Sequence, residues 1–196
     1  MLALNNMNST YNLSSHLPAA EFDACFTNFS KSAFRLETFP EYRVGGADAE
    51  LYNKFSQGEP WQGPIFEDWA RLIASHTTAG REFVVARVLS EPLSNYLRFE
   101  IEWGYCYFST VGQDTRIILP SRLDTLFLPS ATFDYWMFDD NKVVFMEYGS
   151  DGSYKGARYV QNHDSITEFV TLKGRALAAS ISLREFLSLY RTGRIR

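Results

Sequence analysis

The stretch Arg81–Leu89 constrains the fold more than any other part of the chain, because it is β-branched and largely apolar. A strand with one solvated face alternates apolar and polar residues, whereas a strand covered on both faces reads as a continuous apolar run. A helix is expected directly after it, with Ser90 as the N-cap and Leu93, Leu97 and Trp103 at helical spacing. This β–α unit predicts an α/β domain.

The remaining segments extend this pattern. Apolar periodicity predicts helices at about 20–31, 47–57, 64–79 and 164–179, a helical turn within 120–128, and a last helix from Ser182, where Ser182 and Glu185 form a capping-box pattern. Alternation or β-branched content predicts strands at 32–38, 115–119, 133–138, 142–148 and 153–160. Turn-forming residues separate the last three strands, so we expect a β-meander there.

These elements predict a single α/β domain over residues 19–196. It would contain a mixed β-sheet with flanking helices, and its C-terminal β-meander would be followed by two helices. Residues 1–18, which are rich in Asn and Ser, are expected to form a disordered tail. A length of 196 residues suits one domain with one sizeable core.

Composition excludes several classes of protein. An aromatic content of 16% excludes global disorder, and most of the aromatic residues fall at core spacing. The chain has no run of about 18 apolar residues that could cross a membrane. The N-terminus lacks the basic flank and long apolar run of a signal peptide, so we expect a cytoplasmic protein. The net charge of −4 argues against a nucleic-acid partner.

Motifs that carry well-known chemistry are absent from the sequence. Cys25 and Cys106 cannot form a disulfide framework or a cysteine-rich zinc site, and the three histidines are scattered. The chain has no phosphate-binding loop, no dinucleotide fingerprint and no G-x-S-x-G nucleophile elbow. We therefore expect no metal, no cofactor and no nucleophilic catalysis.

The first candidate ligand site lies at the carboxyl end of the central strand. Arg87, Ser90 and Glu91 lie at this end, and Tyr96 and Arg98 follow on the expected helix. Ligands of open α/β sheets bind at this edge, and the amides of a first helical turn favour an anion. The alternative is that Ser90 only caps the helix and that Arg98 only pairs with a neighbouring acid on the helix surface.

The second candidate cluster lies on two other strands. Asp134 and Trp136 share one face of their strand, where a carboxylate beside an aromatic ring could line a pocket. Arg35 and Glu37 are expected on the outward face of the strand at 32–38, with Phe34 facing inward. They would form either a surface ion pair or part of a pocket wall.

Three sequence blocks carry a resemblance to a known family. These blocks are S-A-F-R-L-E-T at 32–38, R-V-L-S-E-P-L-S-N-Y-L-R at 87–98, and W-M-F-D-D-N-K-V-V at 136–144. They resemble an uncharacterised bacterial family that is common in actinomycetes. The genes of that family often lie near helix-turn-helix regulators, so the resemblance implies a signalling role.

A remoter likeness is to the phospholipase D-like fold, in the succession of strand, helix, polar strand, aspartate turn and apolar strand. The catalytic motif of that superfamily is H-x-K-x4-D. The corresponding stretch from Asp134 has neither the histidine nor the lysine. The likeness therefore implies a fold without phosphodiester chemistry.

The leading hypothesis is a non-enzymatic regulatory or ligand-sensing domain of a bacterial signalling system. Its arginines would hold a small anionic ligand, and its protein partner would be a helix-turn-helix regulator or a second copy of the chain. One rival is a biosynthetic enzyme that uses Glu91 or Asp134 as a general base. The other is an adaptor that acts through an aromatic protein–protein interface.

Overall fold

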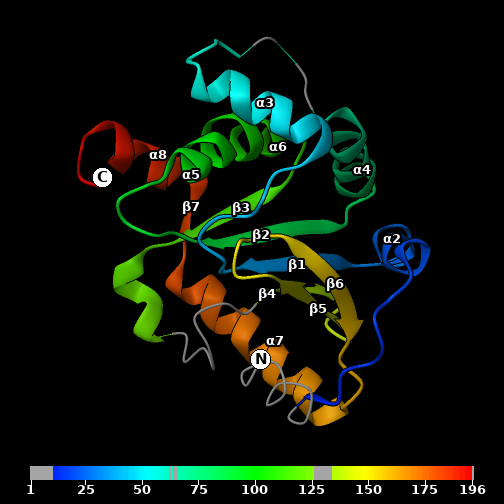
Figure 1. Cartoon of the computed structure of the whole chain (residues 1–196). Helices are drawn as coiled ribbons and strands as arrows, with labels where there is room; N and C mark the ends of the chain where they lie inside the picture. Colours follow the sequence, from blue (N-terminus) through cyan, green and yellow to red (C-terminus); the bar gives the residue numbers. More distant parts are fainter. Residues whose placement is uncertain (1–10, 62, 64–65, 126–133, 196) are drawn as a thin grey trace.

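A single seven-stranded sheet forms the centre of the molecule (Figure 1). This computed structural model describes residues 11–61, 63, 66–125 and 134–195. The strand order is β6-β5-β4-β1-β2-β3-β7. The strands are β1 (Ser32–Glu37), β2 (Glu82–Val88), β3 (Asp114–Ile118), β4 (Asp134–Phe138), β5 (Lys142–Tyr148), β6 (Tyr154–Tyr159) and β7 (Ile181–Ser182). β1, β2 and β3 are parallel and the other pairs are antiparallel, which confirms the mixed sheet and the meander of β4 to β6.

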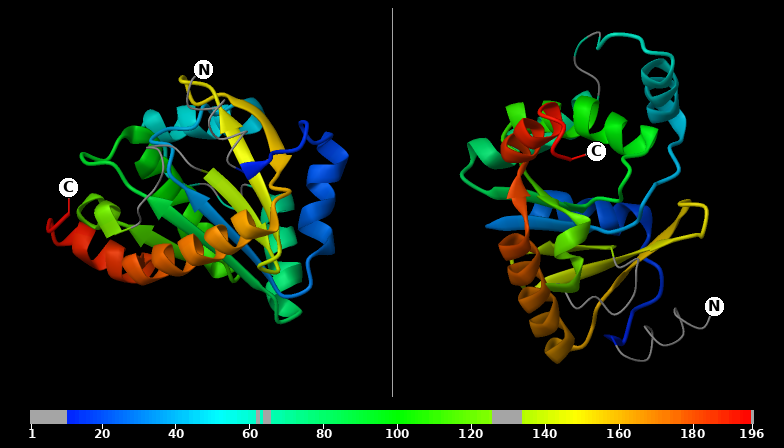
Figure 2. Two further views of the ribbon diagram at one scale, coloured as in Figure 1. Left: turned by 90° about the horizontal axis from the view of Figure 1, so that it is seen from below. Right: turned by 90° about the vertical axis from the view of Figure 1, so that its left-hand side faces the viewer.

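Helices cover both faces of this sheet, as the apolar sequence of β2 predicts (Figure 2). One face packs against α7, and the opposite face against α2, α4 and the run from α5 to α6. The helices are α2 (Ala19–Asn28), α3 (Gly46–Ser56), α4 (Glu67–Thr78), α5 (Asn95–Phe99), the π-helix η1 (Glu100–Tyr105), α6 (Cys106–Thr110), the 3₁₀ turn η2 (Pro120–Thr125), α7 (His163–Ala179) and α8 (Leu183–Arg191). The structure thus confirms a single mixed α/β domain.

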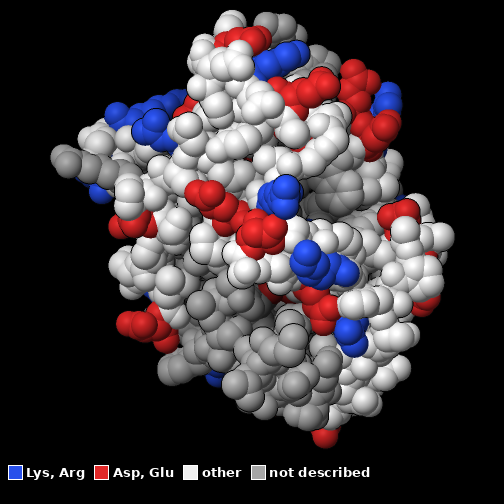
Figure 3. Space-filling view, in the orientation of Figure 1, with Lys and Arg blue, Asp and Glu red and all other residues white. Residues whose placement is uncertain are grey.

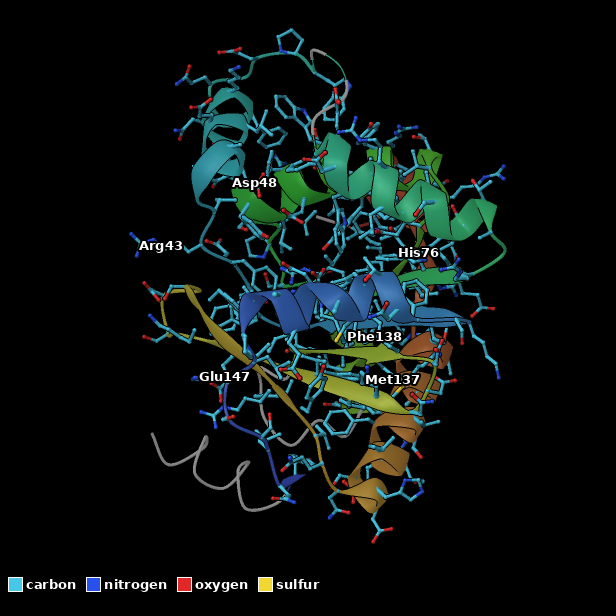
Figure 4. All side chains as sticks on the ribbon, turned by 90° about the vertical axis from the view of Figure 1, so that its right-hand side faces the viewer. Arg43, Asp48, His76, Met137, Phe138 and Glu147 are labelled. Carbon is cyan, nitrogen blue, oxygen red and sulfur yellow. The ribbon has the colours of Figure 1, made fainter. Side chains whose placement is uncertain are left out.

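Successive side chains of each strand enter two different cores. Figure 4 shows Met137 and Phe138 of β4 on opposite faces of the sheet. Met137 belongs to the cluster beneath α7, and Phe138 to the cluster beneath α2 and α4. Because both faces are covered, the expectation of an outward, solvated face for β1 is wrong. Arg35 and Glu37 point into the protein, and Glu37 is buried.

The helix after β2 begins later than expected. Residues 90–93 form no helix, and α5 starts at Asn95 with Ser94 as its N-cap. The Ser94 hydroxyl accepts a hydrogen bond from the Leu97 amide at 3.2 Å, which satisfies one free donor of the first turn. Ser90 therefore caps no helix, and no first-turn amides lie beside it.

The N-terminal segment differs from the expected disordered tail. Tyr11 is buried against Phe169 of α7, with a ring separation of 5.3 Å. The Ser14 amide donates to the Tyr159 carbonyl at 2.9 Å, so residues 11–17 extend the sheet along the edge of β6. Edge strands leave backbone groups that another segment can pair with, which explains why a polar sequence is ordered here. Residues 1–10 lie outside the described residues.

The Asp139 carboxylate ties the β4–β5 turn to the start of β1. It accepts the backbone amides of Ser30 at 2.8 Å, Lys31 at 2.6 Å and Ser32 at 3.0 Å, and also the Ser30 hydroxyl at 3.0 Å. Burial acts to raise the pKa of Asp139, but these hydrogen bonds outweigh it and lower the pKa to about 2.

We predict that Asp139→Ala destabilises the fold, by about 1 to 3 kcal/mol, because three backbone amides lose a charged acceptor. Since the native pKa is lowered, this contribution is complete above the ordinary aspartate pKa and is lost as the pH falls toward 2. Urea unfolding at pH 7 and pH 3 measures both effects. The control is Asp140→Ala in the same turn, because the exposed Asp140 holds a single ion pair with Lys173 at 2.7 Å. Equal losses from the two variants would contradict the role of Asp139.

Candidate ligand pocket

A pocket of about 310 Å³ lies between the sheet and the helices, at the carboxyl ends of the parallel strands. It contains unusually many charged and phenolic groups for a site beside a core. We call it the arginine–tyrosine pocket, and its polar lining includes Arg35, Glu37, Tyr42, Tyr96, Glu100, Tyr105 and Tyr148. Trp69, Phe108 and Trp136 supply its main apolar walls. Arg87 and Asp134 lie directly behind this lining.

Strand order places charges from three strands side by side. Glu37 of β1 is aligned with Arg87 of β2, and Arg35 of β1 is aligned with Trp136 of β4. Residues of one register position point to the same face, so these side chains meet beneath the helices. Asp134 reaches the same edge because the antiparallel β4 starts where β1 ends.

Arg35 forms the floor of the pocket and contacts two carboxylates and a phenol. Its Nε lies 2.7 Å from Glu37 Oε1, and an Nη lies 3.8 Å from Asp134 Oδ2. The other contacts are a hydrogen bond of 2.9 Å to the Tyr148 hydroxyl and a cation–π contact with Trp136 at 5.2 Å. Burial opposes the charge of Arg35, but Tyr148, Glu37 and Asp134 hold its pKa above the usual value.

Arg87 is fully buried, with an exposure of 0%, but it has few partners. One Nη donates to the Pro40 carbonyl at 2.9 Å, whereas Nε and the other Nη find no hydrogen-bond partner among the described residues. The guanidinium lies 5.0 Å from the centre of the Tyr42 ring. Burial disfavours its charge, yet the phenolic and acidic groups around it keep its pKa above the usual value. Arg87 is therefore a buried cation with unused donors.

The π-helix η1 directs a carboxylate and a phenol toward the pocket. Tyr96 and Glu100 are four residues apart, as on one face of an α-helix, and Glu100 and Tyr105 are five apart, as on one face of a π-helix. All three line the pocket, and the Tyr105 hydroxyl donates to the Glu37 carboxylate. Single π-turns occur often at functional sites, because they shift the helix face in this way.

Glu100 has the most perturbed carboxyl group of the pocket. Removal from water raises its pKa to about 7, and the nearby Glu37 carboxylate adds to this effect. Arg87, a hydrogen bond from Tyr96, and Arg35 act in the opposite direction. A carboxyl group that titrates near neutral pH inside a pocket can bind, accept or donate a proton under physiological conditions.

Asp134 fastens the loop over the pocket. Its Oδ1 accepts the Thr38 amide at 2.8 Å, the Thr38 hydroxyl at 2.9 Å and the Phe39 amide at 3.2 Å. Its Oδ2 accepts the Tyr42 hydroxyl. Burial raises the pKa of Asp134, against the effects of Arg35, Tyr42 and Thr38. These partners occupy both oxygens, so Asp134 is a positioning residue for the loop at 38–42.

The mouth of the pocket is closed on one side by a loop contact. Arg43 pairs with Asp151 at 3.1 Å across the mouth, and the Arg43 amide donates to the Gly152 carbonyl at 3.0 Å. Figure 4 shows Arg43 pointing outward, and Figure 3 shows acidic and basic side chains intermixed on the molecular surface. Gly152 has a φ of +74°, and a Cβ there would overlap the Glu41 carbonyl. Both facts demand glycine at this contact.

The structure brings together five of the eight residues predicted to bind a ligand: Arg35, Arg87, Tyr96, Asp134 and Trp136. Ser90 is partly buried and lies outside the pocket lining, and Glu91 and Arg98 are exposed. For Ser90 and Glu91 the separation follows from the late start of α5, which leaves residues 90–93 as a connection, whereas Arg98 lies on the exposed face of α5, two residues after the buried Tyr96. Whether any of the eight binds a ligand stays a prediction.

Sequence reasoning missed Tyr42, Glu100, Tyr105 and Tyr148 as pocket residues. For Glu100 the spacing of four from Tyr96 was a usable signal. No local signal existed for Tyr105, because α-helical spacing places Gly104 rather than Tyr105 on the Tyr96 face. Tyr42 and Tyr148 reach the pocket only through strand order and loop position.

No group of three or more metal-ligating side chains is found within the described part of the chain. His16, Glu147 and Arg158 form a separate cluster at the edge of the sheet, with His16 Nε2 2.5 Å and Arg158 Nε 3.0 Å from the Glu147 carboxylate. This cluster fastens the N-terminal segment to β5 and β6. No described helix is long and apolar enough to cross a membrane.

A family model described as "Domain of unknown function (DUF6879)" matches residues 20–188 of the chain. The chain belongs to the DUF6879 family. The match includes all three sequence blocks that carried the resemblance to an uncharacterised family, and every lining residue of the arginine–tyrosine pocket lies within it. No curated protein is significantly similar to this DUF6879 chain.

Two solved structures are weakly similar to this DUF6879 domain. Nuc from Salmonella typhimurium, a phospholipase D family member, has 9% identity and a TM-score of 0.44, over 83% of this chain and 90% of that chain. NucT from Helicobacter pylori has 9% identity and a TM-score of 0.45, over 86% of this chain and 96% of that chain. At this level the similarity concerns only the arrangement of helices and strands.

We predict that truncating Arg35 lowers the stability of the fold and that truncating Arg87 does not. Arg35→Met leaves Glu37 and Asp134 without their cation and should cost about 2 to 4 kcal/mol of unfolding free energy. Arg87→Met removes a buried charge with unused donors and should leave the stability of the free protein within about 1 kcal/mol of wild type, or raise it. Chemical denaturation of both variants is the measurement. A large loss from Arg87→Met would show that Arg87 serves the fold itself.

Proposed function

We propose that the arginine–tyrosine pocket is the binding site of a small-molecule-sensing domain, and that its ligand carries an anionic group. One observation carries this proposal. Arg87 is fully buried behind the pocket lining, and two of its nitrogens have no hydrogen-bond partner. A buried guanidinium with unpaired nitrogens lowers the stability of the empty protein, so stability does not explain the presence of an arginine at position 87.

A carboxylate or phosphate in the pocket would supply that reason. Guanidinium groups bind such anions through paired N–H donors, and the interaction strengthens in a dry site. Tyr42, Tyr105, Glu37 and Tyr96 surround Arg87, and all four line the pocket. An anion held by these phenols and by Arg35 would lie next to the unused charge. A small shift of Tyr42, whose ring covers Arg87, would complete a direct contact.

The location and the size of the pocket fit a small molecule. It lies at the carboxyl edge of parallel strands, where α/β domains bind ligands. A volume of about 310 Å³ is at the lower end of the range for small-molecule sites. Aromatic walls with few converging polar groups are also typical of such sites.

The regulatory role remains a proposal that this site supports. A ligand seated beneath α3 and the loop at 38–45 would change how that surface is presented to a partner. We propose a cytoplasmic protein partner, such as a helix-turn-helix regulator or a second copy of the chain. The adaptor hypothesis has less support, because the large exposed apolar residues of the described part, Trp61, Tyr154 and Val170, lie on separate elements.

A second candidate function is an enzyme with Glu100 as its general base. The specific observation is a carboxyl group with a pKa of about 7 in a concave site. This role passes to Glu100 from the earlier candidates, because Glu91 is exposed and both oxygens of Asp134 are occupied. Turnover of a bound ligand that Glu100→Gln abolishes while binding persists would establish the enzyme.

The sensing proposal predicts binding of small anions that depends on Arg87. Thermal-shift screening of short mono- and dicarboxylates and phosphate monoesters should yield ligands, and calorimetry on the best of them gives the dissociation constant. Arg87→Met should weaken that binding about tenfold or more, since a charge-assisted contact to a buried anion is lost. The matched control is Arg98→Met, because Arg98 is exposed on α5 and should leave affinity unchanged.

Two results would contradict this proposal. One is a wild-type protein that no anion of the panel stabilises. The other is equal affinity for wild type and Arg87→Met, which would place the anion elsewhere. Loss of binding in Arg98→Met alone would restore the surface site that the sequence predicted.

A further inference from the structure

Charge is divided unevenly between the two sides of the arginine–tyrosine pocket. The sheet side holds the cations Arg35 and Arg87 together with the acids Glu37 and Asp134, which pair with Arg35 and leave Arg87 without an acidic partner among the described residues. The helix side presents two carboxylates, Glu100 from η1 and Asp48 from α3. Within the described residues neither carboxylate forms an ion pair with a lysine, arginine or histidine. Figure 4 shows Asp48 on α3, and Asp48 belongs to the lining of the pocket.

Incompletely paired groups of opposite sign therefore lie on opposite sides of one cavity. Arg87, behind the lining and beneath the Tyr42 ring, has donors without acceptors, and among the described residues Glu100 has only the Tyr96 hydroxyl as a hydrogen-bond partner. An anion alone would satisfy the sheet side but would increase repulsion with Glu100 and Glu37. A cation alone would leave Arg87 unpaired. A ligand with a negative and a positive group would pair with Arg87 and would also offset the charge of Glu100.

We infer that the ligand is an amino-acid-type zwitterion, whose carboxylate faces Arg35 and Arg87 and whose ammonium group faces Glu100 and Asp48. This inference rests on the proposed function and specifies its ligand class. The rings of Trp69, Trp136 and Phe108 would enclose the side chain of the amino acid. The volume of about 310 Å³ accommodates a single amino acid of any size.

An ammonium group would change the electrostatics of Glu100. Burial and then Glu37 of β1 raise the pKa of Glu100, whereas Arg87 of β2, Tyr96 of α5 and Arg35 of β1 lower it, and together they give a pKa of about 7. A cation beside Glu100 favours the ionised form and lowers this pKa. Binding near neutral pH should therefore be accompanied by net proton release.

The experiment is calorimetry on the full chain with matched probes. The standard amino acids are first screened by thermal shift at millimolar concentration. The best one is then compared with its analogue that lacks the amine and with its analogue that lacks the carboxylate. The amino acid should bind about tenfold or more tightly than either analogue, because each analogue leaves one buried charge unpaired.

Glu100→Gln is the variant that separates this inference from the proposed function. It should weaken the amino acid about tenfold, whereas the analogue without the amine should bind equally well or more tightly, because its repulsion by Glu100 is removed. Titrations in buffers of different ionisation enthalpy should show proton release in the wild type and none in Glu100→Gln. The matched control is Glu102→Gln, since Glu102 is exposed on the same helical segment.

Other outcomes overturn the inference in distinguishable ways. If the analogue without the amine binds as tightly as the amino acid and ignores Glu100→Gln, the sensing proposal stands and the zwitterion is wrong. If the analogue without the carboxylate binds as tightly, the ligand is a cation and both proposals fail. If no amino acid binds while other anions do, only the zwitterion fails.

Discussion

The rest of this structure depends on the burial of two arginines, Arg35 of β1 and Arg87 of β2, which project from the sheet into a face that helices cover. Arg35 and Arg87 alternate with apolar residues whose partners lie beneath α7, so both arginines must point toward the helices on the other face. A buried guanidinium needs acceptors, and the protein satisfies the two arginines unequally. Arg35 has Glu37, Asp134 and Tyr148, whereas Arg87 has one carbonyl. The loop at 38–42, the phenols and the π-helix are all arranged around this pair.

The π-helix η1 brings Tyr105 to the side of the helix that faces the buried arginines. A regular α-helix from Tyr96 would present Gly104 to the pocket and direct Tyr105 away from Glu37. The wider π-turn returns Tyr105 to the pocket face, where its hydroxyl donates to Glu37. That hydrogen bond occupies an oxygen of Glu37, and Arg35 holds the other. Glu100, on the same face, keeps a carboxyl group without a cation, and this difference between two neighbouring acids makes the pocket chemically distinctive.

Prediction from the sequence succeeded where the signal is local. Strand β5 and the cap of α8 were predicted closely, because alternation, turn residues and a serine at the N-cap act over a few residues. Prediction failed where long-range contacts decide. Polar residues 11–17 pair with the edge of β6, and the polar pattern of β1 does not show that helices cover its second face. The N-cap of α5 is Ser94 and not Ser90, which leaves the predicted site residues Ser90 and Glu91 outside the pocket.

The sequence by itself determined the class of the fold, the order of its elements and the presence of arginines and aspartates near strand ends, since these follow from periodicity and residue chemistry. Only the tertiary structure decided which of those groups share a cavity. Placing β1 between β4 and β2 brings Arg35, Asp134 and Arg87 within one site, although about a hundred residues separate the first from the second. Arg35 has two acidic partners and Arg87 has only one carbonyl. This difference could not be predicted from the sequence, because it depends on distances between strands and not on spacing along the chain.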